Sequence, residues 1–283
     1  FQGVNAGGGA DVFISKFTNA GVPVWITYYG GSGDDWGNSI CKDPAGNIFV
    51  TGFTDSPNFP VTPGAFQTAK SAVGADAFIL KFDNVGVPQW ATFYGGSGLD
   101  VGHSISSGPS GDIFITGYTN SNNFPVLNPG GGVYFQGVSA GSNDAFVLQF
   151  NNTGTRIWAT YFGGEGDDRG YSVCNDVTGN IFVTGWSGSS STFPVTLGAF
   201  QTANGGGNDV FILKFTTTGV LNWATFYGGA EQDWGYSISS DAGGNIFVTG
   251  QTYSVAFPIL NPGGGSYFQG VLGGNRDAFI LKF

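Results

Sequence analysis

Carboxylates in the loop after each WATFYGG-like segment are the residues whose type and spacing most suggest chemistry. Adjacent aspartates occur in two of these loops, and a single aspartate stands at the matching position of the other two. Hard cations such as Ca²⁺ prefer carboxylate oxygens, which makes Asp34, Asp35, Asp167 and Asp168 candidate calcium ligands. The spacing is not that of an EF-hand. An Asx-turn, whose carboxylate accepts bonds from backbone N–H groups, explains the same residues. We expect the turn, and we expect no cofactor.

Aromatic residues and one arginine vary between the repeats, and they are the second candidate for function. They lie beside the loop aspartate and directly after each VTG-like triplet. Large aromatic rings can stack on sugar rings or on partner side chains. Packing between neighbouring sheets is the alternative interpretation. The candidate ligand-binding residues are Trp36, Tyr118, Arg169, Trp186 and Trp234.

The remaining nucleophilic and titratable residues argue against catalysis. His103 is the only histidine, and no serine or cysteine motif accompanies it, so we expect an ordinary surface histidine. Cys41 and Cys174 occupy the same position in non-adjacent repeats, too far apart for a disulfide, so we expect two buried free thiols. The aspartate that opens each DxF segment recurs in every copy, as a strand cap would. We therefore expect no catalytic residue and no enzyme.

A repeat decides the architecture. Copies of the DAFILKF-like segment begin at residues 11, 76, 144, 209 and 277, so the offset alternates between 65 and 68 residues. Four WATFYGG-like and four GNIFVTG-like segments lie between them. The sequence predicts one domain over 1–283. Its repeats are approximately 18–82, 83–150, 151–215 and 216–283, and 1–17 is a surplus strand that duplicates 268–283.

Each period predicts four strands and no helix, because glycine or proline interrupts every longer window and no apolar spacing of 3.6 residues appears. The central runs are apolar on both faces, which suits a small sheet packed between two others. The fold predicted is all-β: a β-propeller with one four-stranded antiparallel blade per repeat, or part of a larger array. The pattern yields seventeen strands, one more than four such blades use.

The repeated motifs resemble those of a known family. The combination of Asp76–Phe82, Gln89–Gly98, Asn47–Gly52 and the FPV and GAFQ segments resembles the SBBP repeat, a beta-propeller repeat. The resemblance covers essentially the whole chain. It implies a secreted or surface-displayed bacterial protein of the multidomain kind, mostly without an assigned activity.

Composition limits the partners. The chain has 19 acidic and 9 basic residues, a formal net charge of −10, which would repel phosphate backbones and anionic lipids. No apolar run reaches the roughly 18 residues of a membrane helix. The chain opens in mid-motif at Phe1, which we interpret as processing or excerpting. We expect an extracellular or cell-surface location and a protein or carbohydrate partner, with neither nucleic acid nor membrane insertion.

The leading functional prediction is a non-catalytic extracellular module for adhesion, display or ligand binding. The alternative is a structural subunit of a surface polymer or filament, assembled by pairing a terminal strand with another chain. A propeller glycosidase or lyase ranks third, because no single repeat carries unmatched acidic or basic residues of the kind a catalytic site needs.

Overall fold

The computed structural model describes residues 2–283, which form seventeen strands and no helix. All strand pairs are antiparallel, and three sheets have four strands each. The predicted fold class, an all-β array of four-stranded antiparallel blades, is confirmed. Residue 1 of the predicted surplus segment 1–17 lies outside the described range.

Three complete sheets make up the middle of the chain. The first contains β3 (Asp35–Lys42), β4 (Ile48–Thr54), β5 (Asp76–Phe82) and β6 (Pro88–Tyr94). The second contains β7 (Asp100–Ser107), β8 (Ile113–Thr119), β9 (Asp144–Phe150) and β10 (Arg156–Phe162). The third contains β11 (Asp168–Asn175), β12 (Ile181–Ser187), β13 (Asp209–Phe215) and β14 (Leu221–Tyr227).

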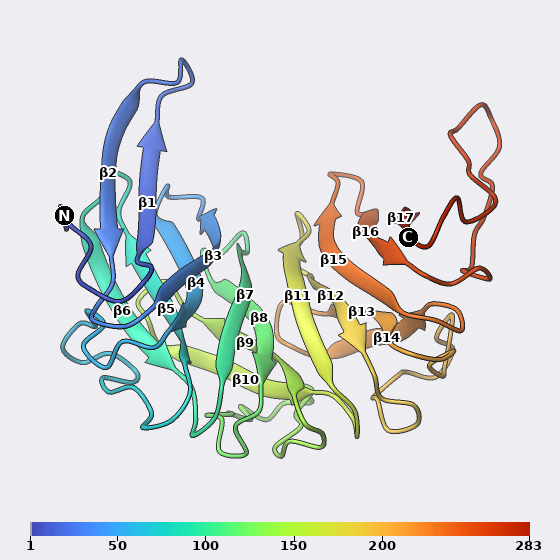
Figure 1. Ribbon diagram of the computed structural model, residues 1–283, viewed down its shortest axis with the longest axis horizontal. Coiled ribbons are helices and arrows are strands. Elements are labelled where there is room, and N and C mark those ends of the chain that lie inside the picture. The colour runs from blue at the N-terminus through green and yellow to red at the C-terminus, as the bar shows by residue number, and fades with distance from the viewer. Residues whose placement is uncertain (1) are drawn as a thin grey trace.

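Incomplete sheets stand at both ends of this array. The N-terminal sheet has two strands, β1 (Val12–Phe17) and β2 (Pro23–Tyr29). The C-terminal sheet has three, β15 (Asp233–Ser240), β16 (Ile246–Thr252) and β17 (Asp277–Lys282). Within residues 2–283 no strand pairing joins the two end sheets, and Figure 1 shows the five sheets along an open arc with the chain ends apart.

The expected division into four four-stranded blades therefore needs correction. The boundaries between sheets fall at a different strand of the repeat than predicted. The turn 83–87 folds β6 back onto β5 as a hairpin, with Phe82 opposite Pro88. The WATFYGG-like strand thus closes the sheet that precedes it, and each sheet begins after the Gly-Gly loop. Cut this way, seventeen strands give sheets of two, four, four, four and three strands.

Burial explains why the central strands are apolar on both faces. β9 is buried along its whole length, and β5 and β13 are buried except at their lysines. Each of the three complete sheets is covered on both faces by its neighbours, as in propeller blades. The recurring FP segments add to this core: Phe59, Phe124, Phe193 and Phe257 are all buried.

Serines join the innermost strands β3, β7, β11 and β15, which line the concave side of the arc (Figure 1). The hydroxyl of Ser39 accepts a bond from the amide of Ile105 in the next sheet, at 3.2 Å. Ser104 and Ser172 accept equivalent bonds at the next two junctions. The serine of the GxSI-like segment therefore links neighbouring blades at three successive junctions.

Candidate binding surface

A β-bulge recurs at the start of every innermost strand. The register shifts after the glycine of each segment, between Gly37 and Ser39 in β3 and at the matching positions in β7, β11 and β15. Bulges re-aim the side chain of the extra residue. The bulged residues are Asn38, His103, Tyr171 and Tyr236.

Three of the bulged residues form ring contacts with one another, and two of them also contact candidate ligand-binding residues. His103 stacks on Tyr171 with ring centroids 4.6 Å apart and lies 5.4 Å from Tyr118. Tyr171 meets Tyr236 edge-on at 5.6 Å, and Tyr236 lies 6.3 Å from Trp234. These rings come from three neighbouring sheets, so the contact runs along the concave side of the arc.

Arg169 closes this set into a ring of contacts. Trp234 stacks on Trp186 at 6.1 Å, and the guanidinium of Arg169 lies 5.2 Å from Trp186 and 4.4 Å from Tyr118. We call the seven side chains the aromatic patch. Its members are His103, Tyr118, Arg169, Tyr171, Trp186, Trp234 and Tyr236.

Arg169 is held in place as well as stacked. Its guanidinium donates to both carboxylate oxygens of Asp167, at 3.0 and 2.9 Å. This bond raises the pKa of the arginine, so its charge is fixed. Burial raises the pKa of Tyr118, which keeps that phenol neutral beside the cation. Arg169 therefore contacts one ring on the second complete sheet and one on its own sheet, as a planar guanidinium can.

His103 differs from its expected role as a surface residue. It is partly buried against Tyr171, and burial, together with the positive charge of Arg169, lowers its pKa to about 4. The imidazole is therefore neutral at physiological pH and behaves as an aromatic ring. No acid or base chemistry near pH 7 follows from it.

The structure brings four of the five candidate residues together and leaves one apart. Tyr118, Arg169, Trp186 and Trp234 belong to the aromatic patch. Trp36 lies on the first complete sheet, 51% exposed, and stacks on Phe53 with ring planes 9° apart. Sequence reasoning missed Tyr171 and Tyr236. Their signal was an aromatic residue between the glycine and the serine of the GxSI-like segment, where a bulge turns the side chain.

The candidate calcium ligands carry hydrogen bonds from the protein. Asp35 accepts bonds from Thr54, Ser56 and the amide of Gly31. Asp168 accepts bonds from Ser189 and the amide of Gly164. Asp34 accepts the amide of Gly9 at 2.5 Å, and Asp167 is paired with Arg169. Within residues 2–283 no three His, Cys, Asp or Glu side chains are grouped as a metal site would need.

Pairs of buried carboxylates lie under the Gly-Gly turns. A Cβ on Gly95 would stand 2.6 Å from Oδ2 of Asp100 and 2.8 Å from Cγ of Asp76, so only glycine fits there. Burial raises the pKa of Asp100 to about 6. Bonds from Thr119, Gly96 and Ser121 oppose the shift, and the charge of Asp76 adds to it.

The same arrangement recurs at the next two junctions. Burial raises the pKa of Asp168 to about 6 and that of Asp209 to about 7, and a neighbouring aspartate contributes in each case. The aspartate of each DxF segment also accepts a bond from the glutamine of the FQ segment, as Asp209 does from Gln201 at 2.8 Å. In four of the five copies the glutamine oxygen in turn accepts a bond from the amide of the first turn glycine. These carboxylates thus tie loops to strands.

The cysteines are free thiols, as expected, although each is half-buried rather than fully buried. Cys41 packs between the first and second complete sheets, and Cys174 packs between the third sheet and the C-terminal one. Burial raises the pKa of both thiols to about 12, and a nearby aspartate adds to each shift.

Comparison with known proteins agrees with this architecture. Residues 24–60 and 89–125 match the family model of the SBBP beta-propeller repeat. Each matched SBBP segment begins in the outermost strand of one sheet and runs through the first two strands of the next. The segment matched by the family model therefore crosses from one blade to another.

A curated relative extends the match. The uncharacterized WD repeat-containing protein L264 of Acanthamoeba polyphaga mimivirus is 25% identical over 338 aligned positions, which cover 100% of this chain. The chain spans 24% of the length of that relative. The relative is viral, so the bacterial source implied by the sequence resemblance is not confirmed.

Solved structures resemble this chain only distantly. A protein of unknown function from Bacteroides caccae has 12% identity and a TM-score of 0.42, covering 87% of this chain and 63% of its own. The gluconolactonase XC5397 from Xanthomonas campestris has 12% identity and a TM-score of 0.39, covering 83% and 61%. Likeness at this level carries no argument about activity. Residues 2–283 also contain no helix long and apolar enough to cross a membrane.

Proposed function

We propose that this array is a non-catalytic extracellular binding module that takes carbohydrate on its concave side. The observation that carries the proposal is the aromatic patch. Rings from three neighbouring sheets meet on the two innermost strands of each sheet, and Arg169 lies between the rings of Tyr118 and Trp186. Sugar rings present flat C–H faces, and partly exposed tryptophan and tyrosine rings offer apolar area with a polar edge.

Exposure within the patch indicates where a ligand would lie. Trp186 is buried and supports the patch from below, whereas Tyr236 is 39% exposed. Trp36 offers a second open indole face on the first complete sheet. A chain of several sugar units could contact both places, and a short ligand would contact only one of them.

The absence of catalysis is part of the proposal. It is supported by the repetition of the buried aspartates, which have similar loop and strand partners in successive sheets. Groups that every unit needs usually build the framework, whereas catalytic pairs stand at one place. The extracellular location rests on the composition and on the SBBP resemblance.

Tryptophan fluorescence with a panel of neutral oligosaccharides tests the proposal. We expect saturable quenching with at least one oligosaccharide, weakened about tenfold or more by Trp234→Ala or Tyr236→Ala. Tyr267→Ala is the matched control, because that tyrosine is exposed on a distant loop. Equal loss in the control, or no saturable change with any oligosaccharide, would contradict the carbohydrate assignment. Hydrolysis of a bound sugar would contradict the non-catalytic one.

Assembly by strand pairing is the second candidate, and a separate observation favours it. β1 and β2 correspond to the third and fourth strands of a sheet, whereas β15, β16 and β17 correspond to the first three. Each end sheet therefore presents an unpaired edge and an uncovered apolar face, which are ready sites for pairing with another strand. A second copy of the chain, or further repeats, would cover them.

Sedimentation velocity over a range of concentrations tests this assembly. We expect the weight-average sedimentation coefficient to rise with concentration, and Ile280→Lys, placed on the uncovered face of β17, to suppress the rise. Thr153→Lys adds the same charge at an exposed turn of a complete sheet and serves as the control. A concentration-independent monomer would contradict pairing between copies.

A further inference from the structure

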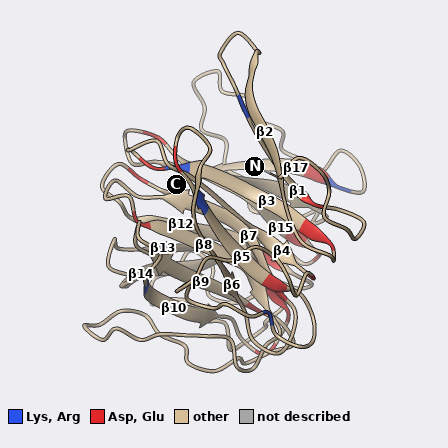
Figure 2. Cartoon of the chain, turned by 90° about the vertical axis from the view of Figure 1, so that its left-hand side faces the viewer, with Lys and Arg blue, Asp and Glu red and all other residues tan. Residues whose placement is uncertain are grey.

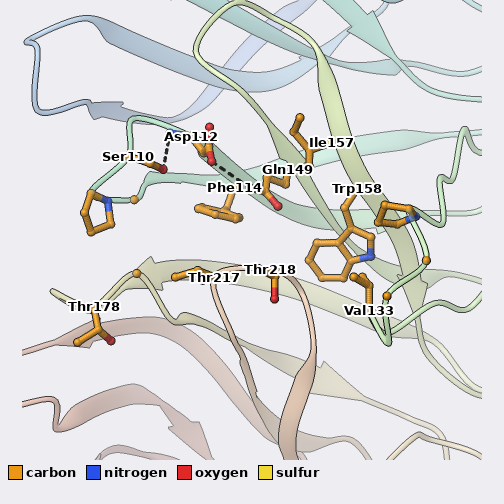
Figure 3. Close-up of a pocket in the computed structure, with 16 residues that line it drawn as sticks. Ser110, Asp112, Phe114, Val133, Gln149, Ile157, Trp158, Thr178, Thr217 and Thr218 are labelled. Atoms are coloured by element: carbon orange, nitrogen blue, oxygen red, sulfur yellow. Dashed lines mark hydrogen bonds between the residues drawn. The ribbon is translucent and has the colours of Figure 1, made fainter.

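A cleft of 760 Å³ lies between the second and third complete sheets, at the opposite end of the strands from the aromatic patch. Asp112, Phe114 and Gln149 form the wall on the second sheet, and Thr217 and Thr218 form the wall on the third (Figure 3). Val133 comes from the longer connection found in the even-numbered repeats. At the neighbouring junctions between sheets, lysine side chains of the repeat bond to the turn of the next sheet.

A lysine occupies the equivalent place at the neighbouring junction. Lys81 Nζ donates to the carbonyl oxygen of Asn152, at 3.0 Å, and lies 5.6 Å from the centroid of Phe49. Lys16 makes the same kind of bond one junction earlier, to the carbonyl of Asn84 at 2.6 Å. Lys214 and Lys282 lie over Phe182 and Phe247 in their own sheets. The repeat thus places an ammonium over a phenylalanine ring.

The second sheet departs from this rule. Gln149 takes the place of the lysine opposite Phe114 in the register, and its amide turns to Asp112, donating to Oδ2 at 3.2 Å. Thr217 stands where the other junctions have Asn84 and Asn152. The indole of Trp158 donates to Tyr134 at 2.9 Å, whereas that of Trp90 donates to the turn carbonyl of Asn152.

The second sheet also carries its carboxylate at a different position, inside the cleft. In the first complete sheet Asp43 accepts two bonds from Asn47 and one from Asn152, so the turn uses its charge. In the second sheet Gly108 replaces that aspartate and Asp112 replaces the asparagine. Oδ1 of Asp112 accepts no bond from the residues that the structure describes. Among residues 2–283 no basic side chain forms an ion pair with Asp112. The chain as a whole also carries more acidic than basic residues, which lie on strands and turns (Figure 2).

We propose that this cleft binds an alkylammonium group, such as a primary amine or the lysine side chain of a partner. The cation would take the position that the repeat's own lysine occupies elsewhere. The carboxylate of Asp112, the carbonyl of Thr217 and the face of Phe114 would surround it, since cations are attracted to both carboxylates and aromatic faces. Val133 and Ile157 offer apolar surface to its alkyl chain.

Nuclear magnetic resonance titration of the ¹⁵N-labelled chain with n-butylammonium chloride tests the site. We expect saturable shifts at the side-chain amide of Gln149 and at the backbone amides of Asp112 and Thr218, with a midpoint in the millimolar range. n-Butanol has the same alkyl chain without the charge and should give no saturable shift. Nα-acetyl-lysine amide is the third probe. Saturable binding by it as well assigns the cleft to a partner's lysine, and binding by butylammonium alone assigns it to a free amine.

Two variants introduce the residue that the other repeats carry at the same position, so both are expected to fold. Gln149→Lys supplies the missing internal lysine and should abolish the saturable shifts. Asp112→Asn should weaken binding at least about tenfold, the loss expected for one charge-assisted hydrogen bond. Asp55→Asn removes an exposed acidic charge elsewhere and should leave binding unchanged. Equal response to butanol, binding that survives in Gln149→Lys, or no saturable shift up to about 100 mM butylammonium would overturn the proposal.

Discussion

Phe78 and Phe13 occupy the same position of the same motif, in the middle and at the end of the array respectively. Phe78 in β5 is fully buried, whereas Phe13 in β1 is 71% exposed. Ile79 in β5 is 1% exposed, and its counterpart Ile280 in β17 is 80% exposed. Neither difference arises from the residue or from its strand.

The neighbouring sheet decides the burial. Each complete sheet has a neighbouring sheet on both faces, while each end sheet has one uncovered face and an incomplete set of strands. Repeat proteins of this kind gain much of their stability from such interfaces between units. The middle of the array should therefore be stable and the ends labile, although the motifs are nearly the same.

Amide hydrogen exchange should display the largest contrast. Amides of β9, which is paired on both edges, should exchange only through global opening, and amides of β1 and β17 through local fraying. We expect rates to differ at least about a thousandfold, since global stability is commonly 5–15 kcal/mol. Uniform protection from β1 to β17 would show that the end sheets are covered in solution.

A matched pair of alanine substitutions should give the next largest difference. Phe78→Ala removes a fully buried ring and should lower the free energy of unfolding by about 3–5 kcal/mol. Phe13→Ala removes an exposed ring and should cost less than about 1 kcal/mol. Urea denaturation measures both. Similar costs would mean that another molecule or segment buries Phe13.

The same contrast explains how much of the molecule could be predicted from the sequence. Strand positions followed from the apolar runs and their glycine boundaries, because local pattern and burial agree in the middle sheets. The grouping of strands into sheets could not be predicted, because a repeating sequence does not show which strand begins a sheet. The hairpin between β5 and β6 decides this, since it places β6 in the same sheet as β5. The aromatic patch was predicted in part. Trp186 and Trp234 were identified from their variable positions, but the bulge that turns Tyr171 toward them is a backbone feature.

The cleft beside Gln149 was not predictable in the same way. It arises from substitutions at residues 108, 112, 149 and 217, which are far apart in the sequence and each unremarkable alone. Their common location appears only once β8 pairs with β9 and the third sheet packs beside them.

The buried carboxylate pairs should produce a pH effect of intermediate size. An aspartate titrates near pH 3.9 when unfolded, and the folded pKa of Asp209 is about 7, so the folded chain binds this proton more tightly. Its contribution therefore falls as pH rises from about 4 to about 7 and is constant above that. Asp209→Asn should flatten this fall, which thermal unfolding at pH 5 and pH 8 would measure. Asp100 and Asp168 should contribute with the same sign over a narrower range, because their pKa values are about 6.

Asp176 is the control, because its pKa is shifted in the opposite direction. Burial would raise its pKa, but bonds from Thr178 and Asn180 outweigh that effect and lower it. Stability from Asp176 is therefore lost as pH falls, and Asp176→Asn should leave the difference between pH 5 and pH 8 nearly unchanged. A flattening in Asp176→Asn, or none in Asp209→Asn, would contradict the assignment.

The labelling rates of the two thiols should differ least, and the difference should show which end of the array opens more readily. Both thiol pKa values are raised to about 12, so neither cysteine should react appreciably with iodoacetamide at pH 8 in the folded chain, because the thiolate is the reactive form. Any labelling must then follow local opening. Cys41 lies between two complete sheets, whereas Cys174 lies against the three-stranded end sheet. We therefore expect Cys174 to be labelled a few times faster than Cys41, measured by mass spectrometry of the two peptides. Equal rates that match global unfolding would mean that the end sheet opens only together with the middle, and faster labelling of Cys41 would place the weak junction at the other end of the chain.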